Sequence, residues 1–447
     1  YLQSEYRAAF ELFSRNRLGA VANEATLGAF QNAKQLPGDD TPAARARRAF
    51  LDSRVGIEID VLFGGGSFDF EQHAKAGRLV DSGYVSAHPE LFRSDVLPEL
   101  VGGERYYDPA GRWIGAAVSG FGICYNPDAL ERLGVPRAPA RWSDLADPRY
   151  HGRIALSDPS KSGSATKAFE MVLQQQMAES VAQAEPPAAA ADTAALGRGF
   201  DRGLALIRRI AGNSRYFTDA SNKIPQDVQA GSAAAGMCID FYGRFENGNL
   251  PNRMKFVLPE RGTSLGSDPI GILRGAPHEE LAREFVGYVL APEGQRLWAL
   301  RVGTAGGPRR YALRRLPILP ALYEPEYAPL RSDPQDNPYR EALGFAYHAA
   351  WTAPLFRAIS FSIRVMCVDA ENELHEAWRA LLEHGSPPRA SALFDASVGI
   401  DYRRVVDEIA PTLERGNPLD EVALADRLLG EVRSHYRDVV RAAQEGR

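Results

Sequence analysis

The chain has 447 residues, of which 45% are hydrophobic and 24% charged, and its formal net charge is −5. These proportions are typical of a globular protein, and the length predicts two or three domains. Because lysine and arginine are spread along an acidic chain, we expect no nucleic-acid partner. No apolar run reaches the roughly 20 residues that span a bilayer.

Cysteine and histidine give no sign of a cofactor or metal. Cys124, Cys238 and Cys367 stand singly in apolar surroundings, which predicts buried free thiols without a disulfide or a zinc motif. The eight histidines are scattered, and none belongs to an HExxH motif. The sequence begins at Tyr1 without a methionine or leader, as a mature or truncated product would, so a missing leader does not favour the cytoplasm.

The first third of the chain predicts helices around one strand. Apolar residues recur at helical spacing over residues 1–15, whereas the polar, turn-rich stretch 36–48 is expected to be a loop. A continuous apolar strand at 59–63, typical of a parallel strand buried on both faces, runs into a glycine turn. A helix is expected over residues 69–76.

The middle of the chain alternates strands with helices. A second apolar strand begins near residue 112 and ends at Asn126, and a third at 153–157 leads through a Ser/Gly turn into a helix. The alanine-rich stretch 181–197 is expected to be a flexible insertion. Helix, strand, capped helix and strand follow over residues 199–246.

Two strands within 253–274 precede helices at 278–290 and 292–300. From about residue 308 the chain is proline-rich and then strongly helical. The alternation predicts an α/β fold with largely parallel sheets and a C-terminal helical extension.

Three segments place a helix start directly after a strand: residues 64–67, 160–164 and 221–222. The first amides of a helix have no internal partner, and the helix dipole is positive there, so such starts bind anions. Open α/β sheets bind ligands at this edge. Together the segments predict a site for phosphate, phosphonate, carboxylate or sulfate, although tight turns and ordinary N-capping remain the alternative.

A fourth segment, CIDFYGRFE, alternates polar with apolar residues, which predicts that Asp240, Tyr242 and Arg244 share one side of a strand or turn. Asp240 could accept hydrogen bonds from a ligand, Tyr242 could donate one and Arg244 could pair with an anion. The alternative is an internal Asp–Arg pair with Tyr242 packed on it.

Catalytic motifs are not supported, and we expect the protein not to be an enzyme. Residues 262–266 match G-x-S-x-G around Ser264, but that motif requires a strand before it and a helix after it. Here a strand is predicted to follow. A serine hydrolase using Ser264 or Ser162 is kept as the alternative from another functional class.

The motifs DVLFGGGSFDF, GFGICYNPDALERLG, RWSDLADPRYHGRIALSDPSKSGS and AGMCIDFYGR occur in an order that resembles a known family. These segments, within about residues 50–320, are similar to extracellular solute-binding proteins of ABC importers. They resemble the type II periplasmic binding proteins, in the branch of ferric-iron, thiamine, phosphonate and sugar-phosphate binders.

The resemblance implies two α/β lobes that enclose the ligand in a cleft. One lobe would hold residues 1–117 plus 270–325, the other 118–269, and residues 326–447 would form the helical extension. The chain would start after the family's first strand. The family's ligand-contacting positions correspond to Gly65, Gly66, Ser67, Ser119, Ser160, Ser162, Gly163, Ser164, Ser221, Asn222, Asp240 and Tyr242.

By the same resemblance, the protein would be a monomeric periplasmic or extracellular receptor that captures a small anionic solute, phosphorylated or a phosphonate. It would deliver that solute to the membrane permease of an ABC transporter. The ferric binders of this branch use two adjacent tyrosines, whereas this chain has Phe241 before Tyr242, and one hard oxygen ligand is missing. A metal receptor using Tyr242, Asp240 and a histidine such as His73 remains an alternative.

Overall fold

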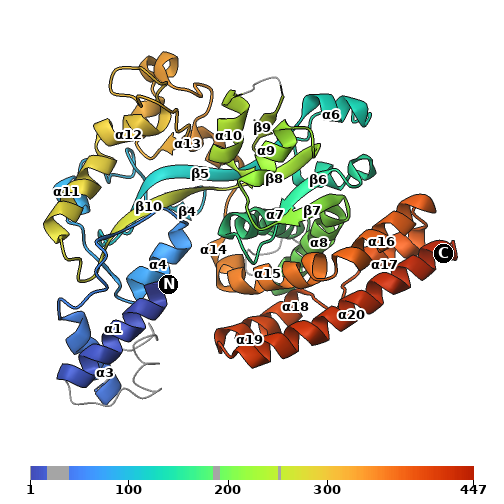
Figure 1. The fold of residues 1–447 in the computed structure, drawn as a ribbon, viewed down its shortest axis with the longest axis horizontal. Helices are drawn as coiled ribbons and strands as arrows, with labels where there is room; N and C mark the ends of the chain where they lie inside the picture. The colour runs from blue at the N-terminus through green and yellow to red at the C-terminus, as the bar shows by residue number, and fades with distance from the viewer. Residues whose placement is uncertain (1, 18–39, 185–191, 250–252, 447) are drawn as a thin grey trace. The chain divides into compact units, whose positions relative to one another are not determined.

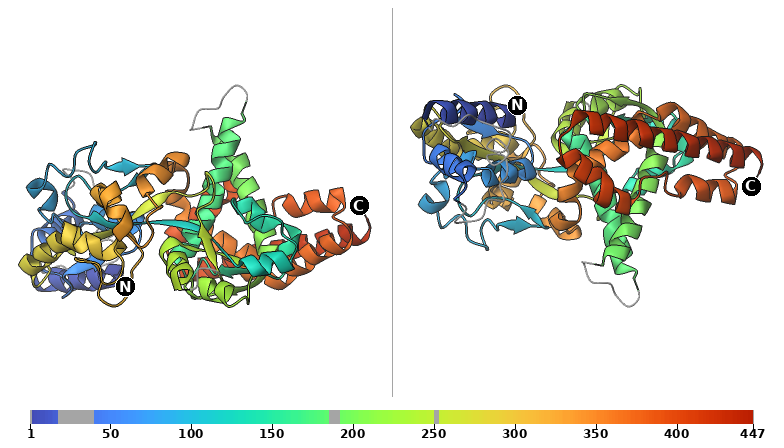
Figure 2. Two further views of the ribbon diagram at one scale, coloured as in Figure 1. Left: turned by 90° about the horizontal axis from the view of Figure 1, so that it is seen from above. Right: turned by 90° about the horizontal axis from the view of Figure 1, so that it is seen from below.

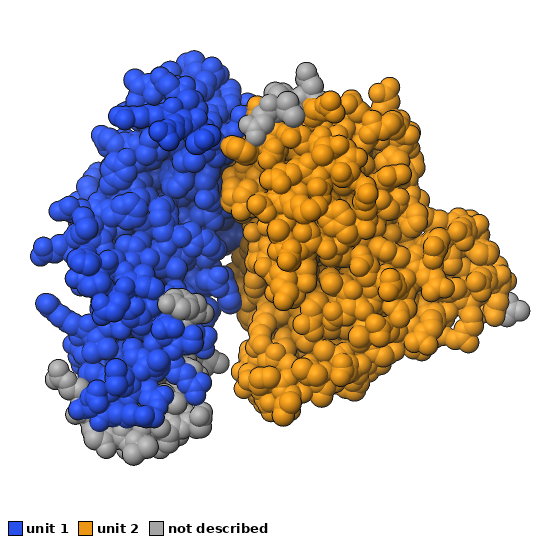
Figure 3. Space-filling view, in the orientation of Figure 1, with its two compact units in different colours: residues 1–119, 265–341 blue, residues 120–264, 342–447 orange. Residues whose placement is uncertain are grey.

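The computed structural model describes residues 2–17, 40–184, 192–249 and 253–446. The chain forms two compact units, coloured separately in Figure 3. The first unit comprises Tyr1–Ser119 and Leu265–Glu341, and the second comprises Gly120–Ser264 and Ala342–Arg447. The cleft expected between two lobes stays a prediction.

In the first unit, strand β10 (Leu265–Leu273) forms antiparallel pairs with β1 (Val61–Phe63) and β2 (Leu79–Val80). The prediction of a parallel strand buried on both faces is therefore wrong for β1. The strand is antiparallel to β10, and Phe63 at its end is 42% exposed. An apolar run of three residues does not fix the direction of a strand. Helices α1 (Leu2–Arg17) and α4 (Ser67–Lys75) confirm the first and second predicted helices.

The polar stretch 36–48 contains the start of a helix, α3 (Pro42–Leu51), where a loop was expected. Thr41 is its N-cap, and the Thr41 hydroxyl accepts a hydrogen bond from the Ala44 amide at 3.2 Å. Threonine followed by proline is a helix-start signal that outweighs a polar composition. Residues 36–39 lie outside the described residues.

The core of the first unit joins helices α1, α3 and α4 to the sheet. Tyr6, Phe10, Phe50, Phe70 and Trp113 are buried in one cluster. The remaining elements of this unit are α5 (Tyr84–Ala87), β3 (Leu100–Val101), β4 (Glu104–Arg105), α11 (Glu279–Leu290), α12 (Pro292–Ala299), β11 (Leu316–Pro317), η3 (Pro320–Tyr323), η4 (Pro325–Leu330) and α13 (Pro338–Glu341).

Strand β5 (Ile114–Tyr125) runs along the chain from the first unit into the second, where the strand order is β5-β8-β6-β7 (Figure 1). Strand β6 (Ile154–Ser157) is parallel to both β7 (Ser214–Thr218) and β8 (Ala235–Ile239). Strands β8 and β9 (Lys255–Val257) are antiparallel to β5. The predicted parallel sheet is therefore confirmed around β6, whereas the described pairings of the other strands are antiparallel.

Helices α7 (Gly163–Ala182) and α8 (Thr193–Gly212) pack closely together in the second unit. A Cβ atom at Gly199 would lie 2.4 Å from the Cα of Met177, so glycine allows this approach of the two backbones. The predicted insertion 181–197 overlaps both helices, and its residues 185–191 lie outside the described part of the chain.

Helices fill the chain after residue 341, and the structure groups them with the second unit. Ile154 and Leu156 of the sheet belong to the same buried cluster as Phe361, Leu381 and Val432. The helices of the predicted C-terminal extension, residues 326–447, are therefore present, and from residue 342 onward they belong to the second unit. Helical periodicity alone does not reveal what a helix packs against. Figure 2 shows the long C-terminal helix running along this helical layer.

The elements of the second unit not yet introduced are α6 (Pro127–Arg132), η1 (Trp142–Ala146), η2 (Pro148–Tyr150), α9 (Lys223–Gln229), α10 (Asp240–Asn249), η5 (Ala342–Gly344), α14 (Ala349–Thr352), η6 (Ala353–Leu355), α15 (Phe356–Ile363), η7 (Arg364–Val368), α16 (Glu371–Glu383), α17 (Pro388–Asp395), α18 (Tyr402–Arg404), η8 (Val405–Ile409), α19 (Ala410–Glu414) and α20 (Pro418–Gln444). Within the described ranges, we find no helix with the length and apolar character needed to cross a bilayer.

Candidate functional site

The carboxyl ends of β6, β7 and β8 meet at one edge of the sheet of the second unit. The parallel register pairs Ser157 with Thr218 and Ala155 with Gly236, so all three strands end at nearly the same level. The segments that follow them therefore emerge at this edge. They contain eight of the predicted ligand positions: Ser160, Ser162, Gly163, Ser164, Ser221, Asn222, Asp240 and Tyr242, the last two in the first turn of α10.

The amino end of α7 presents backbone donors at this edge. Ser162 is the N-cap, and the Ser162 hydroxyl accepts a hydrogen bond from the Ala165 amide at 3.3 Å. The amides of Gly163 and Ser164 donate no hydrogen bond to the described part of the chain. A Cβ atom on Gly163 would meet nothing within 4 Å, so the space beside it is open. Two free amides thus coincide with the positive end of a helix of 20 residues.

Asp158 orders the turn before α7, a role that the sequence analysis missed. The Asp158 amide donates to the Thr218 carbonyl at 2.8 Å, and the Asp158 carboxylate accepts from the Ser160 amide at 2.8 Å. The Thr166 hydroxyl donates to the Pro159 carbonyl, also at 2.8 Å. The signal was present in the sequence, because aspartate followed by proline and serine favours a turn of this kind.

The segment after β7 differs from its prediction. Asn222 occupies the N-cap position of α9 but has helical dihedral angles and makes no side-chain capping bond, so the expected cap is absent there. The Ser221 carbonyl accepts from the Ile224 amide at 3.4 Å. Because α9 has only seven residues, with Pro225 among them, its dipole adds little to this edge.

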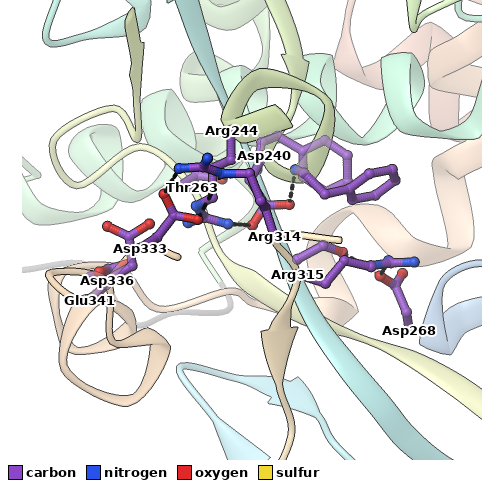
Figure 4. A network of polar contacts seen from close by, with 12 residues as sticks. Asp240, Arg244, Thr263, Asp268, Arg314, Arg315, Asp333, Asp336 and Glu341 are labelled. Carbon is purple, nitrogen blue, oxygen red and sulfur yellow. Dashed lines mark hydrogen bonds and ion pairs between the residues drawn. The ribbon is translucent and has the colours of Figure 1, made fainter. Parts of the chain in front are cut away.

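The segment after β8 is a helix, so the predicted alternation along a strand is wrong. In α10 the four-residue spacing brings Asp240 and Arg244 to the same face, and they form a buried ion pair (Figure 4). Their side chains are only 1% and 5% exposed. The structure thus has the internal Asp–Arg pair that the sequence left open, and Tyr242 is half-buried with its ring 4.5 Å from that of Phe241.

The first unit repeats the strand–turn–helix arrangement at Gly64–Ser67. Gly64 and Gly65 have φ angles of +85° and +99°, which side-chain-bearing residues rarely adopt. Gly66 is the N-cap of α4 and Ser67 its first residue. Because Cβ atoms at these three glycines would meet nothing within 4 Å, the turn is open on that side.

Ser119 is also in the first unit and is already engaged. The Ser119 hydroxyl donates to the Asp268 carboxylate at 2.9 Å, and Arg315 forms an ion pair with the same carboxylate (Figure 4). The Arg315 guanidinium lies over the Trp298 ring, 5.5 Å from its centroid. A ligand could still use the oxygen of Ser119 as an acceptor.

In the ranges that the structure describes, no group of three or more His, Cys, Asp or Glu residues could hold an ion. His73 Nδ1 lies 3.1 Å from the Arg78 guanidinium, and burial together with that cation lowers the pKa of His73 to about 4. The three cysteines are buried free thiols, which confirms that prediction.

The G-x-S-x-G motif around Ser264 lacks the geometry of a nucleophile elbow. Ser264 is buried, and its hydroxyl lies 3.3 Å from the Met171 sulfur. Strand β10 begins directly after Ser264, where a nucleophile elbow would continue into a helix.

The sequence matches the bacterial extracellular solute-binding protein family over residues 60–305, more than half of the chain. The chain belongs to this family. The resemblance and the α/β fold class inferred from the sequence are confirmed.

Among its relatives is the phosphoglycerate transport regulatory protein PgtC of Salmonella typhimurium, 30% identical over 186 residues. That match covers 42% of this chain and 40% of PgtC, so the chain spans about two fifths of that relative's length. The Fe(3+)-binding periplasmic protein of Serratia marcescens is 25% identical over 228 residues, 48% of this chain and 59% of that protein.

Among solved structures, the periplasmic binding protein AfuA from Actinobacillus pleuropneumoniae is similar with a TM-score of 0.40 and 19% identity. The match covers 65% of this chain and 77% of AfuA.

Proposed function

We propose that the protein is the solute-binding component of an ABC importer and that it binds a small organic anion carrying a phosphate or phosphonate group. Membership of the solute-binding family supports the receptor role. The name of the relative PgtC, which refers to phosphoglycerate transport, supports the solute class. The protein would act as a monomer in the periplasm or outside the cell and pass its solute to the membrane permease.

The open amino end of α7 is the observation that carries this proposal. A phosphate oxygen placed there would accept hydrogen bonds from the amides of Gly163 and Ser164 while facing the positive end of the helix. Ser160, Ser164 and Ser221 lie in the segments that follow β6 and β7 at this edge of the sheet. Their hydroxyls could donate hydrogen bonds to further oxygens of the solute. Each charge-assisted bond contributes roughly 1.5–3 kcal/mol, so four or five are compatible with micromolar affinity after ordering costs.

Tyr242 would bind the organic part of the solute through its phenol, whereas Asp240 would act through its pair with Arg244 by fixing the start of α10. Gly65, Gly66 and Ser67 form a second open helix start in the first unit and are proposed as a separate set of contacts.

Gly163→Pro tests the proposal. Proline is favoured at the first position of a helix and has no amide hydrogen, so this change removes one donor while α7 keeps its start. The extended dihedral angles of Ser162, φ −140° and ψ 114°, are compatible with a following proline. Thr193→Pro is the matched control, because Thr193 is the first residue of the equally long α8.

We expect calorimetric titration with 3-phosphoglycerate, glycerol phosphate and methylphosphonate to identify a ligand for the native chain. Gly163→Pro should lower the affinity for that ligand about tenfold or more. Thr193→Pro should leave its affinity unchanged. Equal affinities of the native chain and Gly163→Pro, or no binding of any phosphate or phosphonate, would contradict the proposal.

Ferric iron is the second candidate, because the Serratia relative is described as an Fe(3+)-binding protein. Tyr242 offers one phenol oxygen, but Asp240 is occupied by Arg244, and Phe241 stands where a second phenol would be needed. Metal analysis of the purified protein, with a search for the visible absorption of an Fe(III)–phenolate, separates the two candidates.

A further inference from the structure

A hairpin on the first unit, residues 298–315, has its return path fixed by backbone hydrogen bonds. The Arg315 amide donates to the Trp298 carbonyl at 3.0 Å, and the Gly303 amide donates to the Pro308 carbonyl at the same distance. We call this segment the arginine hairpin. A third hydrogen bond closes a turn at its tip, where the Gly307 amide donates to the Thr304 carbonyl at 2.8 Å.

Positive charge is concentrated in and beside the arginine hairpin. Residues 294–323 contain six arginines and no aspartate, glutamate or lysine, in a chain whose net charge is −5. Four of these arginines are engaged by other groups of the first unit: Arg296 with Tyr327, Arg301 with the Arg331 carbonyl, Arg314 with Asp333 and Arg315 with Asp268.

Arg309 and Arg310 differ from those four. Both are exposed, and neither makes an ion pair or hydrogen bond within the residues that the structure describes. They are the two cations of the hairpin that can bind an external anion. Each guanidinium carries five donors in a planar fork that matches the oxygens of a phosphate.

Apolar side chains are exposed beside these two arginines. Tyr311 follows directly and is 72% exposed, and Leu313 is 43% exposed. Val302 is 46% exposed and precedes Gly303, whose amide donates to the carbonyl of Pro308, the residue before Arg309. Tyrosine and aliphatic side chains next to arginine are typical of segments that enter the headgroup region of a bilayer.

We infer that the arginine hairpin binds the surface of an anionic lipid bilayer. Arg309 and Arg310 contact phosphodiester groups, and Tyr311 lies among the headgroups with Leu313 and Val302 beside it. A lipid surface fits better than an acidic protein surface, because it offers many phosphates and an apolar layer directly behind them. This inference is independent of which solute the protein binds.

Sedimentation with lipid vesicles tests the inference on the full chain. Vesicles of phosphatidylcholine alone are compared with vesicles containing 30% phosphatidylglycerol, at low and at high salt. The test variant is Arg309→Gln/Arg310→Gln, and Tyr311→Ser probes the apolar contribution. The control is Arg137→Gln/Arg389→Gln, which removes the same charge from two exposed arginines of the second unit.

At low salt we expect the native chain and the control to sediment with the phosphatidylglycerol vesicles and to remain in solution with phosphatidylcholine alone. Removing Arg309 and Arg310 should weaken partitioning about tenfold or more. High salt should release the protein, whereas millimolar glycerol phosphate should not, since a free phosphate site would be displaced by it.

Three results would overturn the inference. These are equal binding of the native chain to neutral and to anionic vesicles, equal binding of the double variant and the control, and an absence of vesicle binding at low salt. The last result would exclude the bilayer and leave an acidic protein as the partner of the hairpin. Because the changed side chains are exposed, an unchanged thermal melt of each variant establishes that folding is not the cause.

Discussion

Asp240 and Arg244 show that the same spacing in sequence gives different side-chain contacts on a strand and on a helix. On a strand they would lie on one face of the sheet and could both be free for a ligand. In α10 the same spacing is one helical turn, and the two charges neutralise each other in a buried position. Taking one charge from a buried pair leaves the other without compensation.

Arg244→Met should therefore lower the free energy of unfolding by about 3–5 kcal/mol, because the Asp240 carboxylate loses its buried cation. Urea unfolding followed by circular dichroism measures the change. Arg283→Met is the matched control, since Arg283 pairs with Glu279 at the same helical spacing but on the surface of α11, and we expect less than about 1 kcal/mol there.

The double variant Asp240→Asn/Arg244→Met separates a charge effect from a loss of packing. If an uncompensated carboxylate causes the instability, the double variant should be more stable than Arg244→Met alone. Equal stability of the two variants would show instead that the guanidinium contributes through packing, for instance on the Phe256 ring that lies 5.8 Å away.

At the scale of elements, the close packing of α7 and α8 depends on glycine. Gly199→Ala should destabilise the protein by about 1–3 kcal/mol, because the new methyl group would collide with the backbone at Met177 rather than with a movable side chain. Gly430→Ala is the control: Gly430 lies in α20 with nothing within 4 Å of the Cβ position. There alanine should raise stability by about 0.5–1 kcal/mol through helix propensity.

Thermal melts of both glycine variants check this prediction. A neutral or stabilising effect of Gly199→Ala would mean that α7 and α8 can move apart at little cost. Side-chain packing, and not the close contact of the two backbones, would then hold α7 and α8 together.

Helix starts that are marked by short turn motifs were predicted correctly from the sequence. The Ser/Gly turn before α7 and the glycine turn before α4 were both predicted from short motifs, and the structure places a helix after each. Helix α3 was missed because its polar composition was given more weight than its Thr-Pro start.

Properties that depend on distant partners were harder to predict. The antiparallel direction of β1 depends on β10, more than 200 residues later in the sequence. The helical state of α10 and the pairing of Ser119 with Asp268 likewise follow from tertiary surroundings. For the candidate site, the sequence therefore identified the open helix starts but not which polar side chains are engaged by the protein itself.

At the scale of the whole molecule, the helices after residue 341 contribute directly to the core of the second unit. Beyond the shared apolar cluster, the buried carboxylate of Glu170 in α7 accepts hydrogen bonds from Tyr347 and Thr352, the former at 2.9 Å. Lys167 completes this polar cluster with an ion pair to Glu170 at 2.9 Å. The helix whose amino end carries the proposed solute site is thus fastened to the C-terminal region.

Ending the chain after Glu341 should consequently unfold the second unit, because it would expose the apolar surface that packs on Phe361, Leu381 and Val432 and leave Glu170 without its hydroxyl partners. We expect the truncated chain to bind a hydrophobic dye and to lose the cooperative melt of that unit. Tyr347→Phe, which removes a single hydrogen bond, should cost only about 1 kcal/mol and keep the melt cooperative. A truncated chain that melts cooperatively and binds its solute with native affinity would show that these helices form a separate domain after all.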